Sequence, residues 1–192
     1  MAIRSLKTGL FSRSGMVGNP IILPGDYESI ATIIIGDGGG SSAYFTSIPN
    51  TYQHLQIRFT IRSSSANNDF SIGINNNFAI SNSSSHSLRG NASSAIASNW
   101  ISQGYVSLTN VGSITSAFPS GSIGSGVIDI LDYKSTNKNK TIRTIWGSDQ
   151  NGAGFISINS GMFNTTAAIS EVNLFNGYNW GQYSHFALYG VK

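Results

Sequence analysis

The chain has 192 residues, and 40% of them are hydrophobic, which is enough to bury the core of one β-sandwich or barrel. Only 10% are Asp, Glu, Lys or Arg, and so little charge favours a surface that contacts other protein over the surface of a freely diffusing monomer. Cysteine is absent, so disulfide bridges and thiolate chemistry are excluded.

The net charge of +3 is concentrated near the N-terminus. Arg4, Lys7 and Arg13 precede the first acidic residue, Asp26, and the remaining eight of the 11 basic residues balance the eight acidic ones. Three cations are too few for the basic face of a nucleic-acid-binding domain. The longest apolar run is too short to span a bilayer, and residues 1–11 lack the apolar segment of a signal peptide. We therefore expect synthesis in a cytoplasm, with no nucleic-acid partner and no membrane partner.

Residues 1–25 show neither a helical nor a strand period, because glycines and prolines interrupt the pattern. Apolar side chains are nevertheless frequent in this segment, which is unusual for a disordered tail. We predict an extended N-terminal arm that lies in a groove of a partner subunit, followed by one domain over residues 26–192. The alternative is a segment that folds over the edge of its own domain. The arm residues expected to bind the partner are Arg4, Leu6, Lys7, Leu10, Phe11 and Arg13.

The clearest strand pattern lies in residues 53–62, where apolar and polar side chains alternate. Burying each apolar side chain stabilises the fold by roughly 1.5–3 kcal/mol. A slip of one residue would expose all of them, so we expect a fixed register. The apolar residues are Leu55, Ile57, Phe59 and Ile61.

The segments on either side of this strand predict further strands and two long loops. The Ser- and Asn-rich residues 81–98 show little periodicity, and we predict a surface loop there and a second one over residues 110–121. About ten strands without an amphipathic helix predict an all-β, antiparallel two-sheet sandwich of jelly-roll type, with a closed barrel as the alternative. The other strands are predicted at residues 28–35, 43–48, 70–74, 100–108, 125–133, 141–148, 155–159, 169–175 and 185–191.

Residues suited to catalysis or metal binding are few. His54, His86 and His185 have no carboxylate or second histidine at ligand spacing, so no metal site is predicted. Asp129 and Asp132 are three residues apart in a predicted strand and point to opposite faces, which does not suit a pair of catalytic carboxylates. No Gly-x-Ser-x-Gly elbow is present. We therefore predict no catalytic residue, no enzymatic activity and no cofactor.

Aromatic side chains offer a different chemistry. Residues 178–183 look like a loop, and Tyr178, Trp180 and Tyr183 are candidates for stacking on sugars. Their alternative role is the packing of a loop or a subunit interface. Trp146 alternates with core residues and is predicted to be buried.

Several stretches resemble a family of small structural proteins of tailed bacteriophages, notably those that infect cyanobacteria. They are residues 1–9 (MAIRSLKTG) with 11–14 (FSRS), 49–58 (PNTYQHLQIR), 132–141 (DYKSTNKNKT) and 184–191 (SHFALYGV). These stretches are spread along the whole chain and contain no catalytic motif.

The resemblance implies a component of the virion. The leading hypothesis is a capsid decoration or cement protein on the outer surface of the capsid, assembled in the host cytoplasm. Its arm would lie across the major capsid protein, where the cations complement an acidic surface, and homo-oligomers would multiply weak contacts. The alternative is a tail-fibre or adhesin component that binds host surface glycan through residues 81–98, 110–121 and 176–183.

Overall fold

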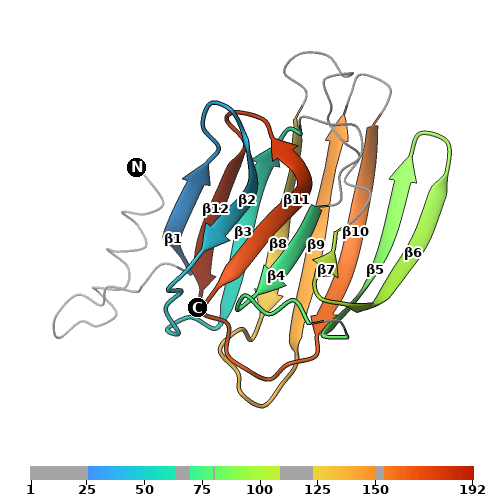
Figure 1. Cartoon of the computed structure of the whole chain (residues 1–192). Coiled ribbons are helices and arrows are strands. Elements are labelled where there is room, and N and C mark those ends of the chain that lie inside the picture. Colours follow the sequence, from blue (N-terminus) through green and yellow to red (C-terminus); the bar gives the residue numbers. More distant parts are fainter. Residues whose placement is uncertain (1–25, 64–69, 80, 109–122, 150–153) are drawn as a thin grey trace, which may run out of the picture.

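The computed structural model describes residues 26–63, 70–79, 81–108, 123–149 and 154–192. These residues form twelve strands and no helix (Figure 1). The number exceeds the ten or so strands predicted from the sequence. The strands are β1 (Tyr27–Ile34), β2 (Gly40–Phe45), β3 (His54–Ile61), β4 (Phe70–Ile74), β5 (Ser83–Asn91), β6 (Ala95–Gln103), β7 (Val106–Ser107), β8 (Gly124–Leu131), β9 (Lys140–Asp149), β10 (Gly154–Phe163), β11 (Val172–Trp180) and β12 (His185–Val191).

The strands form two sheets. The eight-stranded sheet has the order β1-β12-β3-β8-β9-β10-β5-β6, and the four-stranded sheet has the order β2-β11-β4-β7. All neighbouring strands within each sheet are antiparallel. In Figure 1 the four-stranded sheet lies in front of the strands β12, β3 and β8 of the larger sheet. The predicted all-β, two-sheet antiparallel sandwich is therefore confirmed.

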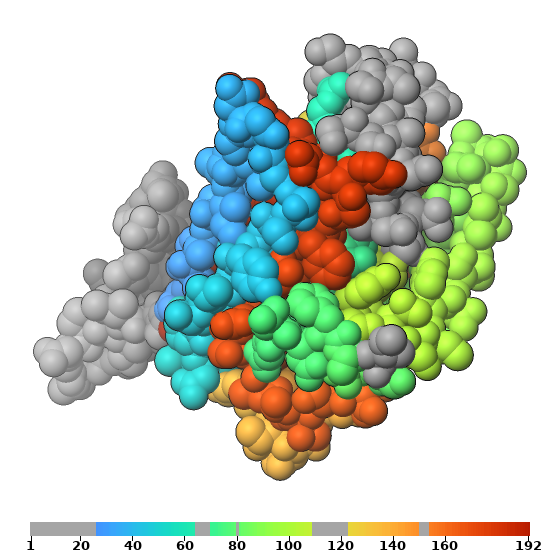
Figure 2. Space-filling model, viewed as in Figure 1, coloured from blue at the N-terminus to red at the C-terminus, as the bar shows by residue number. Residues whose placement is uncertain are grey.

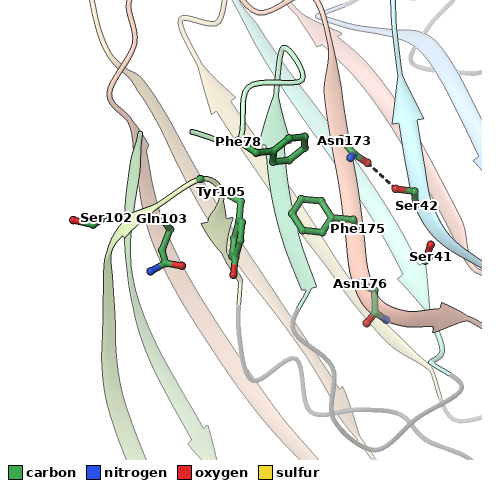
Figure 3. A pocket seen from close by; sticks show the side chains of 10 residues that line it. Ser41, Ser42, Phe78, Ser102, Gln103, Tyr105, Asn173, Phe175 and Asn176 are labelled. Carbon is green, nitrogen blue, oxygen red and sulfur yellow. Dashed lines mark hydrogen bonds between the residues drawn. The ribbon is translucent and has the colours of Figure 1, made fainter. Parts of the chain in front are cut away.

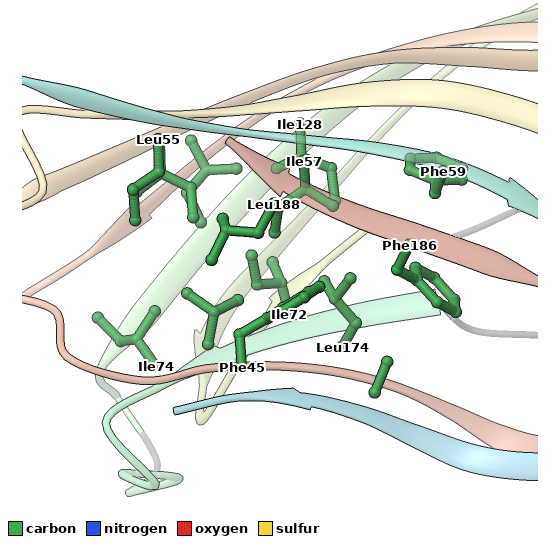
Figure 4. Close-up of a cluster of buried hydrophobic side chains, with 14 of the residues drawn as sticks. Phe45, Leu55, Ile57, Phe59, Ile72, Ile74, Ile128, Leu174, Phe186 and Leu188 are labelled. Carbon is green, nitrogen blue, oxygen red and sulfur yellow. The ribbon is translucent and has the colours of Figure 1, made fainter. Parts of the chain in front are cut away.

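The core lies between the two sheets and is organised around β3. Ile57 lies opposite Leu188 of β12 and Ile128 of β8, and all three side chains are fully buried. Ile72 of β4 and Leu174 of β11 face them from the four-stranded sheet (Figure 4). The predicted register of residues 53–62 is confirmed, because the four apolar side chains of that segment are buried and their neighbours are more exposed.

The hairpins β9-β10 and β5-β6 lengthen the larger sheet beyond β8, and β7 of the smaller sheet packs against β10 and β5. Four polar side chains are buried on the inward face of β9, β10 and β5, beside the buried ring of Trp146; they are Thr144, Ser157, Asn159 and Ser87. Asn159 Nδ2 donates a hydrogen bond to Thr144 Oγ1 at 2.9 Å, so neighbouring strands are also joined by their side chains.

The prediction of a surface loop over residues 81–98 is wrong, because most of that segment belongs to β5 and β6. Small polar side chains such as Ser83, Ser85 and Ser87 point inward, while Leu88 points outward and is exposed. The strand therefore has the reverse of the usual apolar-inside pattern, which hides it from hydrophobic periodicity. Residues 100–108 do not form one strand either, since β6 and β7 lie in different sheets.

The turn after β8 is fixed by a buried cation. Lys140, with 0% of its surface exposed, donates hydrogen bonds from Nζ to the carbonyl groups of Ser135, of Lys138 at 2.9 Å and of Thr166 at 3.1 Å. Burial lowers the pKa of Lys140 by removing water from the ammonium group. Much of the segment 132–141 therefore serves to build this turn.

Candidate functional site

A pocket of about 660 Å³ lies on the outward face of the four-stranded sheet. Phe175 of β11 and Ser42 of β2 form part of its floor, and Phe78 and Tyr105 stand beside them (Figure 3). Figure 2 shows this face of the molecule, where the cyan strand β2, the red strand β11 and the green segments after β4 and β6 meet. The described residues that line the pocket carry no charge.

Two glycines make room for the ring and the backbone of Phe78. A Cβ atom on Gly73 of β4 would lie 2.5 Å from Phe78 Cε1, so only glycine allows the ring to lie over the strand. A Cβ atom on Gly104 would overlap with the Phe78 backbone. The two glycines therefore allow Phe78 to lie against β4 and also against the turn between β6 and β7.

The three rings of the pocket pack at nearly right angles. The centroid of the Phe175 ring is 5.6 Å from that of Phe78 and 5.5 Å from that of Tyr105, with interplanar angles of 80° and 87°. Such edge-to-face pairs are the favoured geometry of aromatic contacts. Phe78 nevertheless remains exposed and offers ring surface to a ligand.

Amide side chains lie next to the rings. Asn173 of β11 is only 7% exposed, and its Oδ1 accepts a hydrogen bond from Ser42 Oγ at 3.1 Å. The side chain of Asn176 is also buried and accepts a hydrogen bond from the backbone N–H of Tyr178 at 3.0 Å. Gln103 lies on the opposite side of the pocket. The arrangement offers aromatic surface and neutral hydrogen-bonding groups, and its described lining contains no acid, base or cation.

A β-bulge brings Gln103 to the pocket. The register between β5 and β6 shifts between Ser83 and Ser85, and Ser102 takes a positive φ of 56°. Bulges bend a strand and redirect its side chains, and they are frequent near binding sites. The bulge therefore changes the direction of the side chains at the end of β6, while Gln103 still pairs with Ser83 of β5.

The aromatic residues predicted from the sequence occupy three different environments. Tyr178 is exposed within β11, and Tyr183 is 76% exposed in the turn before β12, with a φ of 68°. Trp180 ends β11 and is fully buried, with its ring centroid 4.5 Å from Phe186 and 5.9 Å from Phe70. The prediction of Trp180 as a ligand-stacking loop residue is wrong, because the strand carries it into the core.

Sequence reasoning missed Phe78, Tyr105 and Phe175. These residues come from three separate segments, and the fold alone brings their rings together. Gly73 of β4 was a signal, since glycine in a strand often marks the close approach of another group, here the Phe78 ring.

A second surface of interest lies on the outward face of the larger sheet. Ile158 of β10 lies directly opposite Ile145 of β9 and Leu88 of β5, and Ile156 lies two residues before Ile158. All four side chains are between 52% and 57% exposed. We call these four residues the outer apolar patch.

The edge strand next to this patch carries no charge. β6 is the last strand of the eight-stranded sheet, and its sequence AIASNWISQ contains no Asp, Glu, Lys or Arg. Exposed edges are usually protected by charges or prolines against pairing with another chain.

Titratable side chains make structural contacts. His54 Nδ1 accepts a hydrogen bond from the backbone N–H of Asp132 at 3.0 Å, which suits the structural role predicted for a histidine in a strand. The hydrogen bonds from Lys138 and Gln53 lower the pKa of the Asp132 carboxyl group. Among the described residues, no group of three or more His, Cys, Asp or Glu side chains is placed to hold a metal ion.

Two groups of predicted contacts lie outside the described residues. They are the arm residues Arg4, Leu6, Lys7, Leu10, Phe11 and Arg13, and the predicted loop 110–121.

Comparisons with protein-family models, with curated proteins and with solved structures found no match for this chain. In the described part of the chain, no helix is long and apolar enough to cross a membrane.

Proposed function

We propose that this chain is a non-enzymatic structural protein of a tailed-phage virion, and specifically a decoration or cement protein on the outer surface of the capsid. The proposal begins from the resemblance of four stretches of the sequence to small phage structural proteins. Two observations on the structure support it, namely the strand order of the sandwich and the outer apolar patch.

The strand order suits a jelly roll with two inserted hairpins. In the framework β1-β12-β3-β8 and β2-β11-β4-β7, the first strand pairs with the last and the second pairs with the last but one. This nesting is what two interleaved Greek keys produce, and jelly rolls are common in viral capsid domains. The hairpin β5-β6 is inserted between β4 and β7, and the hairpin β9-β10 between β8 and β11.

The outer apolar patch is the observation that carries the proposed attachment to protein. Ile145, Ile158 and Leu88 form an unbroken row across three strands, and half-buried Val127 continues the row onto β8. Neighbouring apolar side chains that stay more than half exposed favour contact with another protein surface. The occupant that we propose is the major capsid protein.

The N-terminal arm supplies the second part of the proposed attachment. Arg4, Lys7 and Arg13 complement an acidic capsid surface, while Leu6, Leu10 and Phe11 bury apolar area in a groove. Bridging several capsid subunits adds interface free energy to a shell that must resist the pressure of packaged DNA. The uncharged edge of β6 favours homo-oligomers, which multiply such contacts.

A binding assay on purified capsid shells tests this proposal. The full chain carrying Ile145→Lys and Ile158→Lys is compared with the unmodified chain by quantitative co-sedimentation. A Thr32→Lys variant is the matched control, because Thr32 is exposed on the same face at the opposite end of the same sheet. We expect the double variant to bind at least about tenfold more weakly, which corresponds to about 1.4 kcal/mol. If the double variant binds capsid shells with the same affinity as the unmodified chain, the outer apolar patch does not bind the capsid.

A separate variant tests the arm. Arg4→Glu, Lys7→Glu and Arg13→Glu together reverse the local charge without shortening the chain. We expect weaker binding at low salt and a smaller difference at high salt, since screening removes the electrostatic part of the contact. Equal binding of both forms at low salt would contradict the proposed role of the arm.

The second candidate function is that of a tail-fibre or adhesin component that binds host surface glycan. The pocket around Phe175 favours it, because aromatic rings beside neutral amides suit a saccharide. The location of the protein in the virion separates the two candidates.

A further inference from the structure

We propose that the pocket formed by Phe78, Tyr105, Phe175 and Asn173 binds a neutral saccharide unit of one or two sugar rings. This inference concerns the isolated chain and goes beyond the proposed attachment to the capsid. It applies to a protein of the head and to a protein of the tail alike.

The aromatic residues supply the apolar part of the recognition. The face of an aromatic ring is electron-rich and attracts polarised C–H groups, such as those on the less polar face of a pyranose. Phe175 contacts both other rings, so its position is fixed from two sides. Phe78 is 40% exposed and presents its surface to the pocket.

The amide of Asn173 supplies a directed hydrogen bond. Its Oδ1 already accepts from Ser42 Oγ, which fixes the orientation of the side chain. Among the residues that the structure describes, its Nδ2 group has no hydrogen-bond partner. The Nδ2 group is not fully buried and lies on a residue that lines the pocket, so it can donate a hydrogen bond to a sugar hydroxyl there.

The lining selects against charged ligands. The described lining residues include serine, asparagine and glutamine, but none is an acid or a base. A sialic acid, a uronic acid or a sulfated sugar would lose its hydration there without gaining an ion pair. The volume of about 660 Å³ is ample for one or two neutral sugar rings.

The pocket is preorganised by the backbone. Phe78 packs closely against the backbone of Gly73 and of Gly104, where any side chain would overlap with it. The bulge at Ser102 sets the position of Gln103. Binding therefore needs little ordering of side chains, which lowers its entropic cost.

Titration of the purified full chain with defined sugars tests the inference. The probes are methyl glycosides and disaccharides of glucose, galactose, mannose and their N-acetylated amino sugars, with sialyllactose as the acidic comparison. Binding is followed by saturation-transfer NMR and isothermal calorimetry. We expect at least one neutral probe to bind with a dissociation constant of about 1 mM or tighter, and sialyllactose to bind more weakly.

Three variants locate the site. Asn173→Asp keeps the shape of the side chain but replaces the donor by a charge, and Phe175→Ala removes the central ring. We expect each to weaken binding at least about tenfold. Tyr183→Ala is the control, because it removes an exposed aromatic side chain that does not line the pocket, and it should leave binding unchanged. Thermal unfolding of each variant checks that the fold is retained.

Two results would overturn the inference. The first is that none of the neutral probes binds at about 10 mM. The second is that Asn173→Asp, in its folded state, binds them as well as the unmodified chain does. Either result would leave the proposed capsid attachment untouched, because that attachment is tested at another face of the molecule.

Discussion

The ring of Tyr52 occupies the space above Gly190 that a Cβ atom on Gly190 would fill. Tyr52 Oη also donates a hydrogen bond to Glu28 Oε2 at 2.9 Å, so the segment before β3 is joined to both β1 and β12. The hydrogen bond to the Glu28 carboxylate raises the pKa of Tyr52. Residues 49–58 and 184–191, which are far apart in the chain, therefore meet here for a structural reason.

The Gly190→Ala substitution tests this contact. An added methyl group overlaps with the Tyr52 ring, and we expect overpacking to lower the free energy of unfolding by about 1–3 kcal/mol. Gly177→Ala in β11 is the control, because a methyl group at that position would have no neighbouring atom within 4 Å. Urea denaturation of both variants measures the difference, and equal stability of the two would contradict the contact.

Lys140 is expected to contribute strongly to stability. Lys140→Met keeps the length of the side chain but leaves three carbonyl groups without their donor, and we expect a loss of about 1–3 kcal/mol. Lys138→Met removes an exposed ion pair with Asp132 and should cost less than about 1 kcal/mol. Chemical denaturation ranks the two variants, and a smaller loss for Lys140→Met would mean that the buried cation is not what fixes the turn.

Trp180 and Tyr183 are expected to differ sharply although they are three residues apart. Trp180→Ala removes a fully buried ring from the core and should destabilise the protein by about 3–5 kcal/mol. Tyr183→Ala changes an exposed side chain and should shift stability by less than about 0.5 kcal/mol. Melting temperatures of the two variants check this order. A Trp180→Ala variant as stable as the unmodified chain would contradict the buried position of the ring.

Asp132 should make stability depend on pH in the acid range. The hydrogen bonds from Lys138 and Gln53 lower its pKa in the folded state. Its contribution is therefore fully present above the unfolded pKa of about 4 and is lost as the pH falls through the lower folded value. Asp132→Asn should flatten the fall of the melting temperature below about pH 5. Asp37→Asn, in the turn after β1, is the control, and the same flattening in both variants would contradict the assignment.

The uncharged edge of β6 predicts association between copies of the chain. If β6 edges pair, light scattering should give a mass that is a multiple of 20.4 kDa, and Ala97→Lys should shift the population toward monomer. A monomeric chain at all concentrations would contradict pairing through this edge.

The predictability of each element from sequence depended on where its apolar side chains point. The alternation around Ile57 predicted β3 and its register, because one face of that strand is buried and the other is wet. The same reasoning failed for β5, where serines point inward and Leu88 points outward. Trp180 also escaped prediction, since residues 178–183 look like a loop in sequence, whereas β11 continues as far as Trp180.

The candidate pocket was less predictable than the fold. Phe78, Tyr105 and Phe175 carry no motif in sequence, and their proximity results from long-range pairing of β2, β4 and β11 and from the bulge in β6. Sequence reasoning identified the chemistry of aromatic stacking but assigned it to Tyr178, Trp180 and Tyr183, none of which lines the pocket.

The central proposal is that this chain is a decoration protein of a tailed phage, and the most direct test is to look for it in purified virions of the phage proposed to carry it. An antibody raised against the full chain is coupled to gold and imaged on intact particles. We expect label distributed over the icosahedral head, as a decoration protein requires. Label confined to the tail tip would move the assignment to host recognition, and the absence of the protein from washed virions would contradict a structural role altogether.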